Sequence, residues 1–355
     1  MATITRKPSG LYQAQVCING IRKAKSFQRA ADAKRWAAAF TLSVGEGEHP
    51  ESTLPLRHFI EEHAARISVA HKHPRHEKAV LGYLLEDPIA DLKTGAVTPR
   101  DIDAWIDRRR TIPSRTTGVI VKESTIARQK QIISSMFAGL VRRGIIKENP
   151  CKGSEKVADA LPRERTASPE DIERLKLVAQ WEEGQPPLNK MQSVCAAFIL
   201  SCLTGMRAGE MMRIERTWIQ GNTIRLPAEA TKTATARTII LCDRAKKILD
   251  AVCALGFEPT IWDLEDGTRD ALWRKIRDQA DLRNVYDSHG RLIRQGLTFH
   301  DGRATFCTWA ASPGPDGAPR MDVMSLSRQT GHKNLKMLMR YYRPRMEDFI
   351  DRLNQ

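Results

Sequence analysis

The dipeptide Asn19-Gly20 is the feature that most constrains the local fold of this chain. Asn-Gly is the strongest short signal for a two-residue hairpin turn, because both residues tolerate a positive φ. Strand-like alternation flanks it over residues 11–18 and 21–27. We therefore predict an antiparallel hairpin, which residues 3–7 extend to three strands. A helix over about 30–42 follows, with Trp36, Ala39 and Phe40 on one face.

The segment 52–150 is predicted to be helical. Ser52 is placed to cap a first helix, and Thr98-Pro99 opens a second. A third helix is expected from residue 124 or 125 to near Gly144. The remainder is mixed: helices are predicted at about 169–180, 189–204 and 244–255, and short strands around 218–226 and 238–241.

These patterns predict a multidomain protein that is mainly α with small β-sheets. The expected domains are residues 1–45 (sheet plus helix), 52–150 (helical) and 165–355 (α+β). Polar connections at 45–50 and 150–166 separate them.

The charge balance favours a polyanionic partner. Lys and Arg number 57 against 42 Asp and Glu, a net charge of +15. The surplus is spread evenly: residues 1–50 hold 8 basic and 3 acidic groups, 51–150 hold 17 and 12, and 151–355 hold 32 and 27. Several parts of the chain are therefore expected to share one anionic partner. The alternative is a basic protein that has this composition but no polyanionic partner.

Other classes are disfavoured. No apolar run approaches the ~20 residues of a membrane span, and the N-terminus lacks the apolar stretch of a signal peptide. Seven scattered cysteines without a CxxC pair are typical of reduced thiols, so we expect a cytoplasmic protein. His71, His73 and His76 have no Cys or carboxylate to complete a metal site, and no metal is expected.

Two groups of cations are candidates for phosphate contact. The first lies on the predicted N-terminal strands and comprises Arg6, Lys7, Arg22, Lys23 and Lys25. A two-stranded ribbon fits the DNA major groove, but lysines also protect a solvated sheet edge. The second is the run Arg108-Arg109-Arg110 at the end of a predicted helix, which suits either phosphate or the helix dipole.

The C-terminal segment carries an ordered set of cations and one tyrosine. Thr204-Gly205-Met206-Arg207-Ala208-Gly209-Glu210 follows an apolar helix, and Lys232 sits between two predicted strands. His300 and Arg303 share a helical face. Gly331-His332 lies nine residues before Tyr341.

In this order and at these spacings the set resembles the tyrosine recombinase (phage integrase) family, whose catalytic domain carries TGxRxxE, a hairpin lysine, HxxR and GH followed by tyrosine. The resemblance is specific over about 195–345. Residues 52–150 look like the family's core-binding domain and residues 1–45 like its arm-binding module. Three positions depart from the common pattern: Gly302 and Ala304 in the HxxR segment, and Ile240 where a proline is usual.

The resemblance implies a site-specific DNA recombinase that needs no metal, ATP or other cofactor. Tyr341 would be the nucleophile that forms a 3′-phosphotyrosyl intermediate, although Tyr342 is its neighbour. Arg207 and Arg303 would bind the scissile phosphate, Lys232 would protonate the leaving 5′-oxygen, and His300 would act as acid and base. His332 would donate a hydrogen bond to the phosphate, and Glu210 would orient its neighbours.

The implied partners are double-stranded DNA attachment sites and three further copies of the chain, in a homotetramer on DNA. An excisionase and a host DNA-bending protein are further candidates, and no membrane is expected. The implied role is integration or excision of a phage or mobile element at a bacterial nucleoid. The alternatives are a chromosome-dimer resolvase, which usually lacks the arm module, and a DNA-binding regulator that keeps the fold without catalysis.

Overall fold

The predicted N-terminal hairpin is present in the computed structural model. β1 (Ala2–Arg6), β2 (Tyr12–Ile18) and β3 (Ile21–Phe27) form an antiparallel sheet in that order. Ile18 pairs with Ile21, the register that a two-residue connection requires. The Asn19-Gly20 turn itself lies outside the described residues.

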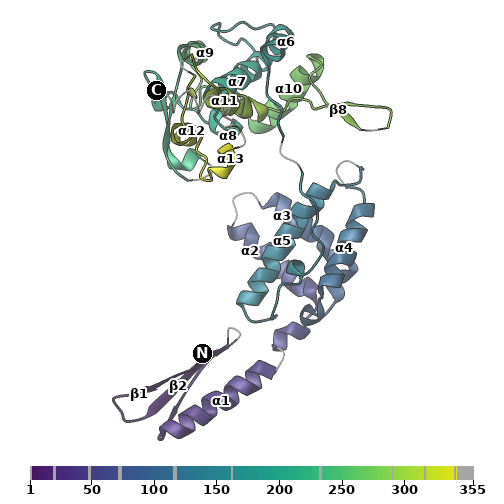
Figure 1. The fold of residues 1–355 in the computed structure, drawn as a ribbon, viewed down its shortest axis with the longest axis vertical. Coiled ribbons are helices and arrows are strands. Elements are labelled where there is room, and N and C mark those ends of the chain that lie inside the picture. Colours follow the sequence, from purple (N-terminus) through teal and green to yellow (C-terminus); the bar gives the residue numbers. More distant parts are fainter. Residues whose placement is uncertain are drawn as a thin grey trace. The chain divides into compact units, whose positions relative to one another are not determined.

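The structure describes residues 2–18, 21–46, 49–70, 74–114, 118–160, 163–231, 234–289, 291–315, 317–339 and 341. The chain divides into two units, Met1–Pro162 and Arg163–Gln355 (Figure 1). The expected division into three domains stays a prediction.

Helix α1 (Ala30–Glu46) packs on one face of the N-terminal sheet (Figure 1). The core between them consists of small residues: Ala14 and Val16 from β2, and Ala33 and Ala37 from α1. Small side chains allow a helix to lie close to a sheet, but they bury little apolar area. Trp36 adds to this core by stacking on Phe40, with ring centroids 5.3 Å apart.

A bundle of four helices forms the rest of the first unit. Its elements are α2 (Leu56–Ala70), α3 (Arg75–Leu85), α4 (Pro99–Thr111) and α5 (Glu123–Arg142). Short 3₁₀ turns join or flank them at Pro50–Thr53, Pro88–Asp91, Thr94–Ala96 and Pro150–Lys152. The bundle has its own core, in which Phe59, Trp105 and Phe137 are fully buried.

Two predictions for this bundle were wrong. Ser52 does not cap α2: it lies within a 3₁₀ turn, and Leu54 adopts an extended ψ of 146° because the next residue is Pro55. Helix α3 was missed. Pro74 stands at the N-cap position of α3, where its missing N–H costs nothing.

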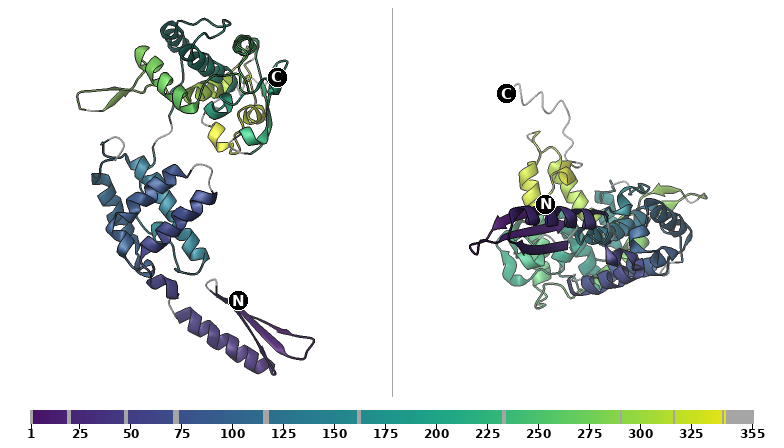
Figure 2. Two further views of the ribbon diagram at one scale, coloured as in Figure 1. Left: turned by 180° about the vertical axis from the view of Figure 1, so that it is seen from behind. Right: turned by 90° about the horizontal axis from the view of Figure 1, so that it is seen from below.

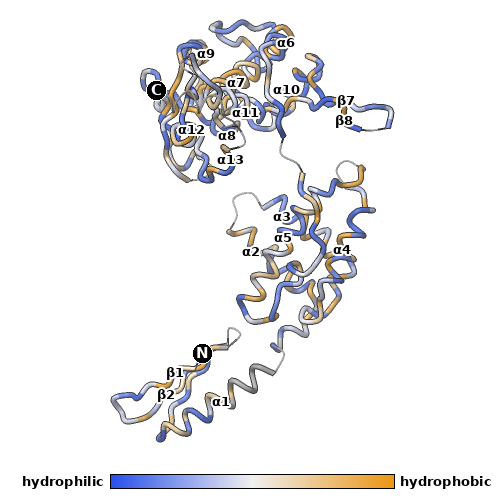
Figure 3. The backbone as a smooth tube through the Cα atoms, in the orientation of Figure 1, coloured by the Kyte–Doolittle hydropathy of each residue, from blue (hydrophilic) through white to orange (hydrophobic). Residues whose placement is uncertain are grey.

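The second unit is built around helix α7 (Lys190–Thr204), every residue of which from Ser193 to Cys202 is buried. Its strongly apolar character is visible in Figure 3. Four helices pack against it: α6 (Pro169–Ala179), α9 (Asp243–Cys253), α10 (Asp266–Gln279) and α11 (Asp301–Ala311). The predicted helices at 169–180, 189–204 and 244–255 are thus confirmed within one or two residues.

The strands and shorter helices of this unit lie around that framework. β4 (Ile219–Gln220), β5 (Thr223–Leu226) and β6 (Arg237–Ile240) form an antiparallel sheet, as predicted. β7 (Val285–Tyr286) and β8 (Leu292–Arg294) form a hairpin that reaches away from the helices of this unit (Figure 2). The remaining elements are α8 (Ala208–Met211), 3₁₀ turns at Arg216–Trp218 and Ala228–Ala230, α12 (Val323–Thr330) and α13 (Lys336–Met339).

Among the described parts of the chain, no helix has both the length and the hydropathy needed to cross a membrane.

Replacing Phe198 by Ala is predicted to destabilise the second unit severely. Phe198 is fully buried, stacks on Trp273 at 4.3 Å and meets Phe299 edge-on at 5.8 Å. Loss of a buried aromatic ring leaves a cavity and costs about 3–5 kcal/mol. Urea unfolding should measure this loss. The control is Leu188→Ala, because Leu188 is 83% exposed and its truncation should cost little. Equal stability of the two variants would contradict the central position of α7.

Candidate active site

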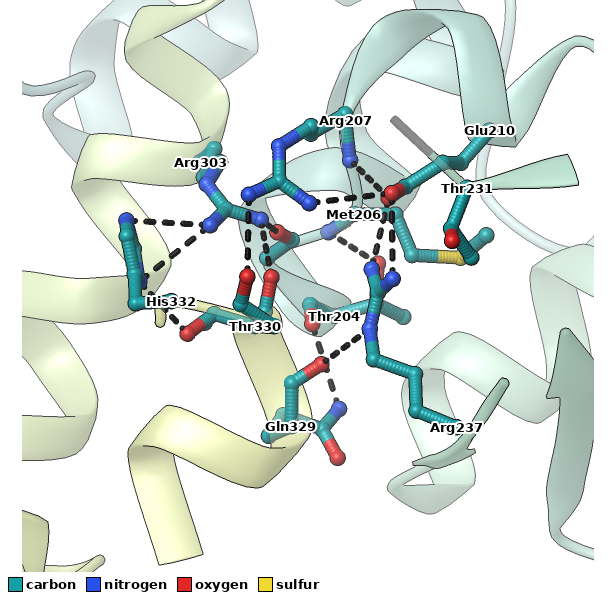
Figure 4. A network of polar contacts seen from close by, with 12 residues as sticks. Thr204, Met206, Arg207, Glu210, Thr231, Arg237, Arg303, Gln329, Thr330 and His332 are labelled. Atoms are coloured by element: carbon teal, nitrogen blue, oxygen red, sulfur yellow. Dashed lines mark hydrogen bonds and ion pairs between the residues drawn. The ribbon is translucent and has the colours of Figure 1, made fainter. Parts of the chain in front are cut away.

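Two helices of the second unit end at glycines, and their ends meet. α7 is followed by Gly205 and α12 by Gly331, each with φ 69°. A left-handed C-cap of this kind favours glycine because a Cβ would be strained. At Gly205 a Cβ would also lie only 2.5 Å from the ring of Phe306. The carbonyls at these two ends point to the same place and accept hydrogen bonds from arginines (Figure 4).

Arg303, on the first turn of α11, is the innermost of these arginines. Arg303 is 3% exposed, and its Nη1 donates to the carbonyls of Gly205 and Thr330, both at 2.7 Å. Nη2 lies 3.0 Å from Nε2 of His332. Helix C-termini carry partial negative charge, so they suit a buried guanidinium.

Arg207 lies beside Arg303 at the N-cap position of α8 (Figure 4). Its Nη2 donates to the carbonyl of Gly331 at 3.0 Å, and its Nη1 donates to Oε1 of Glu210 at 3.0 Å. The Arg207 side chain is 21% exposed, so part of the guanidinium faces outward. The structure thus brings together Arg207, Arg303, His332 and Glu210, four of the residues predicted from the sequence.

Glu210 holds a further arginine that the sequence did not single out. Arg237, at the start of β6, donates from Nη1 to Oε1 at 3.0 Å and from Nη2 to Oε2 at 2.6 Å. Glu210 also accepts from the backbone N–H of Arg207 at 2.9 Å. The Glu210 side chain is 2% exposed, and burial is the largest single influence on the carboxyl and raises its pKa. The hydrogen bonds and positive charges of Arg237 and Arg207 together outweigh burial and keep the pKa of Glu210 below the ordinary value.

Gln329 connects three elements of the site, and no sequence motif pointed to it. Its buried amide donates to the carbonyls of Thr204 and Ile240, both at 3.1 Å. Its Oε1 accepts from the N–H of Ile240 at 2.9 Å. A proline, usual in the family at the position of Ile240, has no N–H to offer. Ile240, which departs from the family pattern, therefore provides through its N–H one of the hydrogen bonds that hold α12 against β6.

His332 is oriented by the residue that precedes the glycine cap. Oγ1 of Thr330 lies 2.7 Å from Nδ1 of His332, and the same hydroxyl donates to the carbonyl of Leu326 at 2.6 Å. Because the Thr330 hydroxyl already donates its hydrogen to Leu326, it can only accept a hydrogen bond from the imidazole. This contact therefore favours a proton on Nδ1.

The other predicted catalytic residues have different placements. His300 is the N-cap residue of α11, one turn before Arg303, and it is exposed. Tyr341 follows α13, is half-buried and packs against the cluster that contains Phe306 and Leu338. Lys232 and the alternative tyrosine, Tyr342, lie outside the described residues.

Gly302, the second departure from the family pattern, has a packing reason. A Cβ at this position would lie 3.0 Å from Oγ of Ser201 and 3.2 Å from the ring of Phe198. Helix α11 therefore approaches α7 too closely for the leucine that is common there, and the glycine keeps Arg303 within reach of the α7 carbonyls.

The electrostatics of the cluster favour a bound anion. Burial, and then the positive charge of Arg207, lower the pKa of Arg303 to about 10. Two guanidiniums that disfavour one another's charge are stabilised together by a phosphate between them. In the described parts of the chain, no group of three or more His, Cys, Asp or Glu is placed to hold a metal ion.

The cations predicted on the N-terminal strands divide between two faces of the sheet. All five are exposed. Paired residues share a face, so Lys23 and Lys25, opposite Val16 and Ala14, lie on the side that α1 covers, at its margin. Arg22 pairs with Cys17 and lies on the open face. The residues sharing that face are mainly small and polar: Thr3, Thr5, Gln13, Gln15 and Ser26.

The arginine run at the end of α4 is largely committed to partners within the fold. Arg109 is buried, donates to Gln129 at 3.0 Å and lies 4.2 Å from the ring centre of Tyr83. It cannot reach an external phosphate, so its prediction as a DNA contact is wrong. Arg108 forms a bidentate pair with Asp87. Arg110 contacts three carboxylates, those of Asp107, Glu123 and Glu155.

A different group of arginines on α2 and α5 has no acidic partner among the described residues. Arg66 and Arg142 converge on the backbone of Gly139: a Cβ there would lie 3.6 Å from Nη2 of Arg66 and 3.8 Å from Nη2 of Arg142. Both are exposed, and with Arg128 they line a cavity of about 390 Å³. The sequence did not distinguish these arginines from other helical cations.

Known proteins are similar to this chain over most of its length. Residues 175–348 match the model of the family described as "Phage integrase family". A protein of Haemophilus influenzae described as an integrase/recombinase is 28% identical, over 98% of this chain and 89% of that protein. The shufflon-specific DNA recombinase of Escherichia coli is 23% identical, over 85% of this chain and 72% of the relative.

Solved structures share the fold at low sequence identity. The Tn1549 transposon integrase in complex with a circular intermediate DNA superimposes with a TM-score of 0.62 and 15% identity, over 84% of this chain and 99% of that one. A lambda integrase dimer bound to a COC′ core site gives 0.61 and 16%, over 97% and 95%. A lambda integrase tetramer bound to a Holliday junction gives 0.60 and 15%, over 93% and 95%.

Replacing Gly205 by Ala is predicted to destabilise the protein, because the left-handed φ and the contact with Phe306 both oppose a Cβ. A strained position of this kind costs about 1–3 kcal/mol. Gly209→Ala is the matched control: it lies four residues away in α8, and a Cβ there meets nothing within 4 Å. Thermal unfolding should show a lower midpoint for the Gly205 variant only. Two unchanged midpoints would contradict the closeness of α7 to α11.

Proposed function

This chain belongs to the tyrosine recombinase (phage integrase) family and is a tyrosine-type site-specific DNA recombinase, and we propose that it integrates or excises a phage or mobile element. The observation that carries the catalytic assignment is the cluster of Arg207, Arg303 and His332 at the meeting point of two helix ends. Guanidinium groups bind phosphate through paired N–H donors and remain charged at neutral pH, so this cluster suits a phosphodiester.

Tyr341 is the proposed nucleophile. Its phenolic oxygen attacks the scissile phosphorus, the bond from phosphorus to the 5′-oxygen breaks, and a 3′-phosphotyrosyl ester forms. His300 accepts the phenol proton, and Lys232 gives a proton to the departing 5′-oxygen. Because one phosphoester replaces another, the bond energy is kept, and the 5′-hydroxyl of a second strand can reverse the step without ATP.

Arg207 and Arg303 are proposed to stabilise the pentacoordinate transition state, in which negative charge gathers on the nonbridging oxygens. The 3.0 Å contact between Arg303 and Nε2 of His332 supports a position of the imidazole beside that phosphate. The contact of Nδ1 with Thr330 holds the ring in this orientation. Preorganised donors of this kind are worth ~10²–10³ in rate each.

We propose double-stranded attachment-site DNA as the substrate and a homotetramer as the active assembly. The DNA-bound forms of the Tn1549 and lambda integrases, and the lambda tetramer on a Holliday junction, support this proposal by similarity of fold. An excisionase and a host DNA-bending protein remain proposed accessory factors. The bacterial nucleoid is the proposed place of action, and β1–β3 are proposed to read arm-type DNA through the open face that carries Arg22.

Substitution of Tyr341 by Phe is predicted to abolish the covalent complex with DNA, because the phenolic oxygen is removed. Incubation with a nicked DNA that traps the intermediate, followed by denaturing electrophoresis, measures the adduct. Tyr342→Phe is the control and should retain it. An adduct that survives in Tyr341→Phe and disappears in Tyr342→Phe would reverse the assignment. A wild-type protein that binds the DNA but forms no adduct would favour the regulator that keeps only the fold.

The double substitution Arg66→Gln and Arg142→Gln is predicted to weaken DNA binding and to lower its salt dependence. If each arginine neutralises one phosphate, the slope of log affinity against log salt should fall by about 2. Fluorescence anisotropy over a salt series measures both quantities. Arg57→Gln is the control, because Arg57 already pairs with Asp91. An unchanged slope in the double variant would remove these arginines from the DNA interface.

A further inference from the structure

Arg237 is a largely buried arginine outside the motifs that define the family resemblance. It lies at the start of β6, and its side chain is 9% exposed. Both of its terminal nitrogens contact Glu210, at 3.0 and 2.6 Å, and its Nε lies 3.3 Å from the carbonyl oxygen of Gln329. Because both terminal nitrogens of Arg237 are bound to Glu210, we expect this guanidinium to influence the reaction through the groups it touches.

The group it touches most is the carboxylate that also holds Arg207. Glu210 carries one negative charge and contacts two positively charged side chains, those of Arg207 and Arg237. Arg237 binds it with two side-chain nitrogens, whereas Arg207 uses one side-chain nitrogen at 3.0 Å and its backbone N–H. A bidentate pair is the stronger of the two arrangements. The negative charge of Glu210 is therefore taken up mainly by Arg237, and Arg207 keeps most of its own positive charge.

We propose that Arg237 is a positioning residue that offsets the charge of Glu210, so that Glu210 can orient Arg207 without neutralising it. This inference rests on the proposed function of Arg207 at the scissile phosphate. In the absence of Arg237, both oxygens of the buried carboxylate would turn to Arg207. The resulting ion pair would be close to neutral, and its attraction for the transition-state phosphate would be correspondingly weak.

The decisive variants are Arg237→Gln, Glu210→Gln and the double variant, with rates of adduct formation measured on nicked DNA. Arg237→Gln should slow adduct formation by about 10²-fold, the scale for one lost electrostatic donor. Glu210→Gln should slow it by about tenfold, because Arg207 loses orientation but keeps its charge. The double variant should react like Glu210→Gln, which is faster than Arg237→Gln, because no carboxylate remains to neutralise Arg207.

A matched control is available in the same unit. Arg244 and Glu183 also form a bidentate pair, with contacts of 2.6 and 2.5 Å, on α9 and the connection after α6. Arg244→Gln, alone and with Glu183→Gln, should leave the rate of adduct formation unchanged. Thermal unfolding of every variant separates loss of rate from loss of folded protein, and Arg237→Lys keeps the charge if the Gln variant does not fold.

A second measurement tests the charge directly. DNA with a methylphosphonate at the scissile position lacks one charged nonbridging oxygen, so it depends less on the net charge of the arginines. The defect of Arg237→Gln should shrink from about 10²-fold to less than about tenfold on this DNA. A defect of the same size on both substrates, or a double variant no faster than Arg237→Gln, would overturn the proposal in favour of a packing role. Absence of an adduct with wild-type protein would instead contradict the proposed function.

Discussion

The hydrogen bonds between two arginines, one buried and one partly exposed, and the carbonyls at two helix ends are the interaction on which the rest of the site depends. The last carbonyls of a helix have no partner within the helix, and a left-handed glycine leaves them pointing outward. At Gly205 and Gly331 these groups face one another and fix the guanidiniums of Arg303 and Arg207. The helices must therefore be packed correctly before the cations can be. This is why the glycines at positions 205 and 302 matter, since both permit close contact with Phe306 or with α7.

Holding two cations side by side requires that the repulsion between their charges be offset, in addition to fixing their positions. Burial, and then the positive charge of Arg207, lower the pKa of Arg303, which shows that holding this guanidinium in its charged form costs free energy. Glu210 relieves that cost only in part, because Arg237 competes for it. The cluster thus keeps a net positive charge, which favours the binding of an anion such as phosphate. Orientation and net charge come from different residues, an arrangement that a single arginine–glutamate pair could not provide.

Local patterns predicted the elements, and spacing predicted the motif residues, but long-range pairing was not predictable. The hairpin at β2–β3 and the apolar helix α7 have short-range causes, and their predicted bounds were close to those observed. Arg207, Arg303 and His332 were identified because a family pattern supplies their spacing. Arg237 was missed because its partner lies 27 residues away, and Gln329 because its partners lie 89 and 125 residues away. Nothing in a strand's alternation indicates which carboxylate its arginine will meet.

The same limit explains the arginine run, and it gives a general criterion for basic proteins of this kind. In the sequence Arg108, Arg109 and Arg110 form the most basic run of the helical region, whereas Arg66 stands alone and Arg142 is followed by one further arginine. In the fold the run meets Asp87, Gln129, Glu123 and Glu155, whereas Arg66 and Arg142 both approach the backbone of Gly139. A cation is available to DNA when the fold leaves it without a carboxylate, regardless of how basic its neighbours in sequence are. The net charge of +15 therefore does not indicate which residues contact DNA, because many basic side chains pair with carboxylates that composition cannot locate.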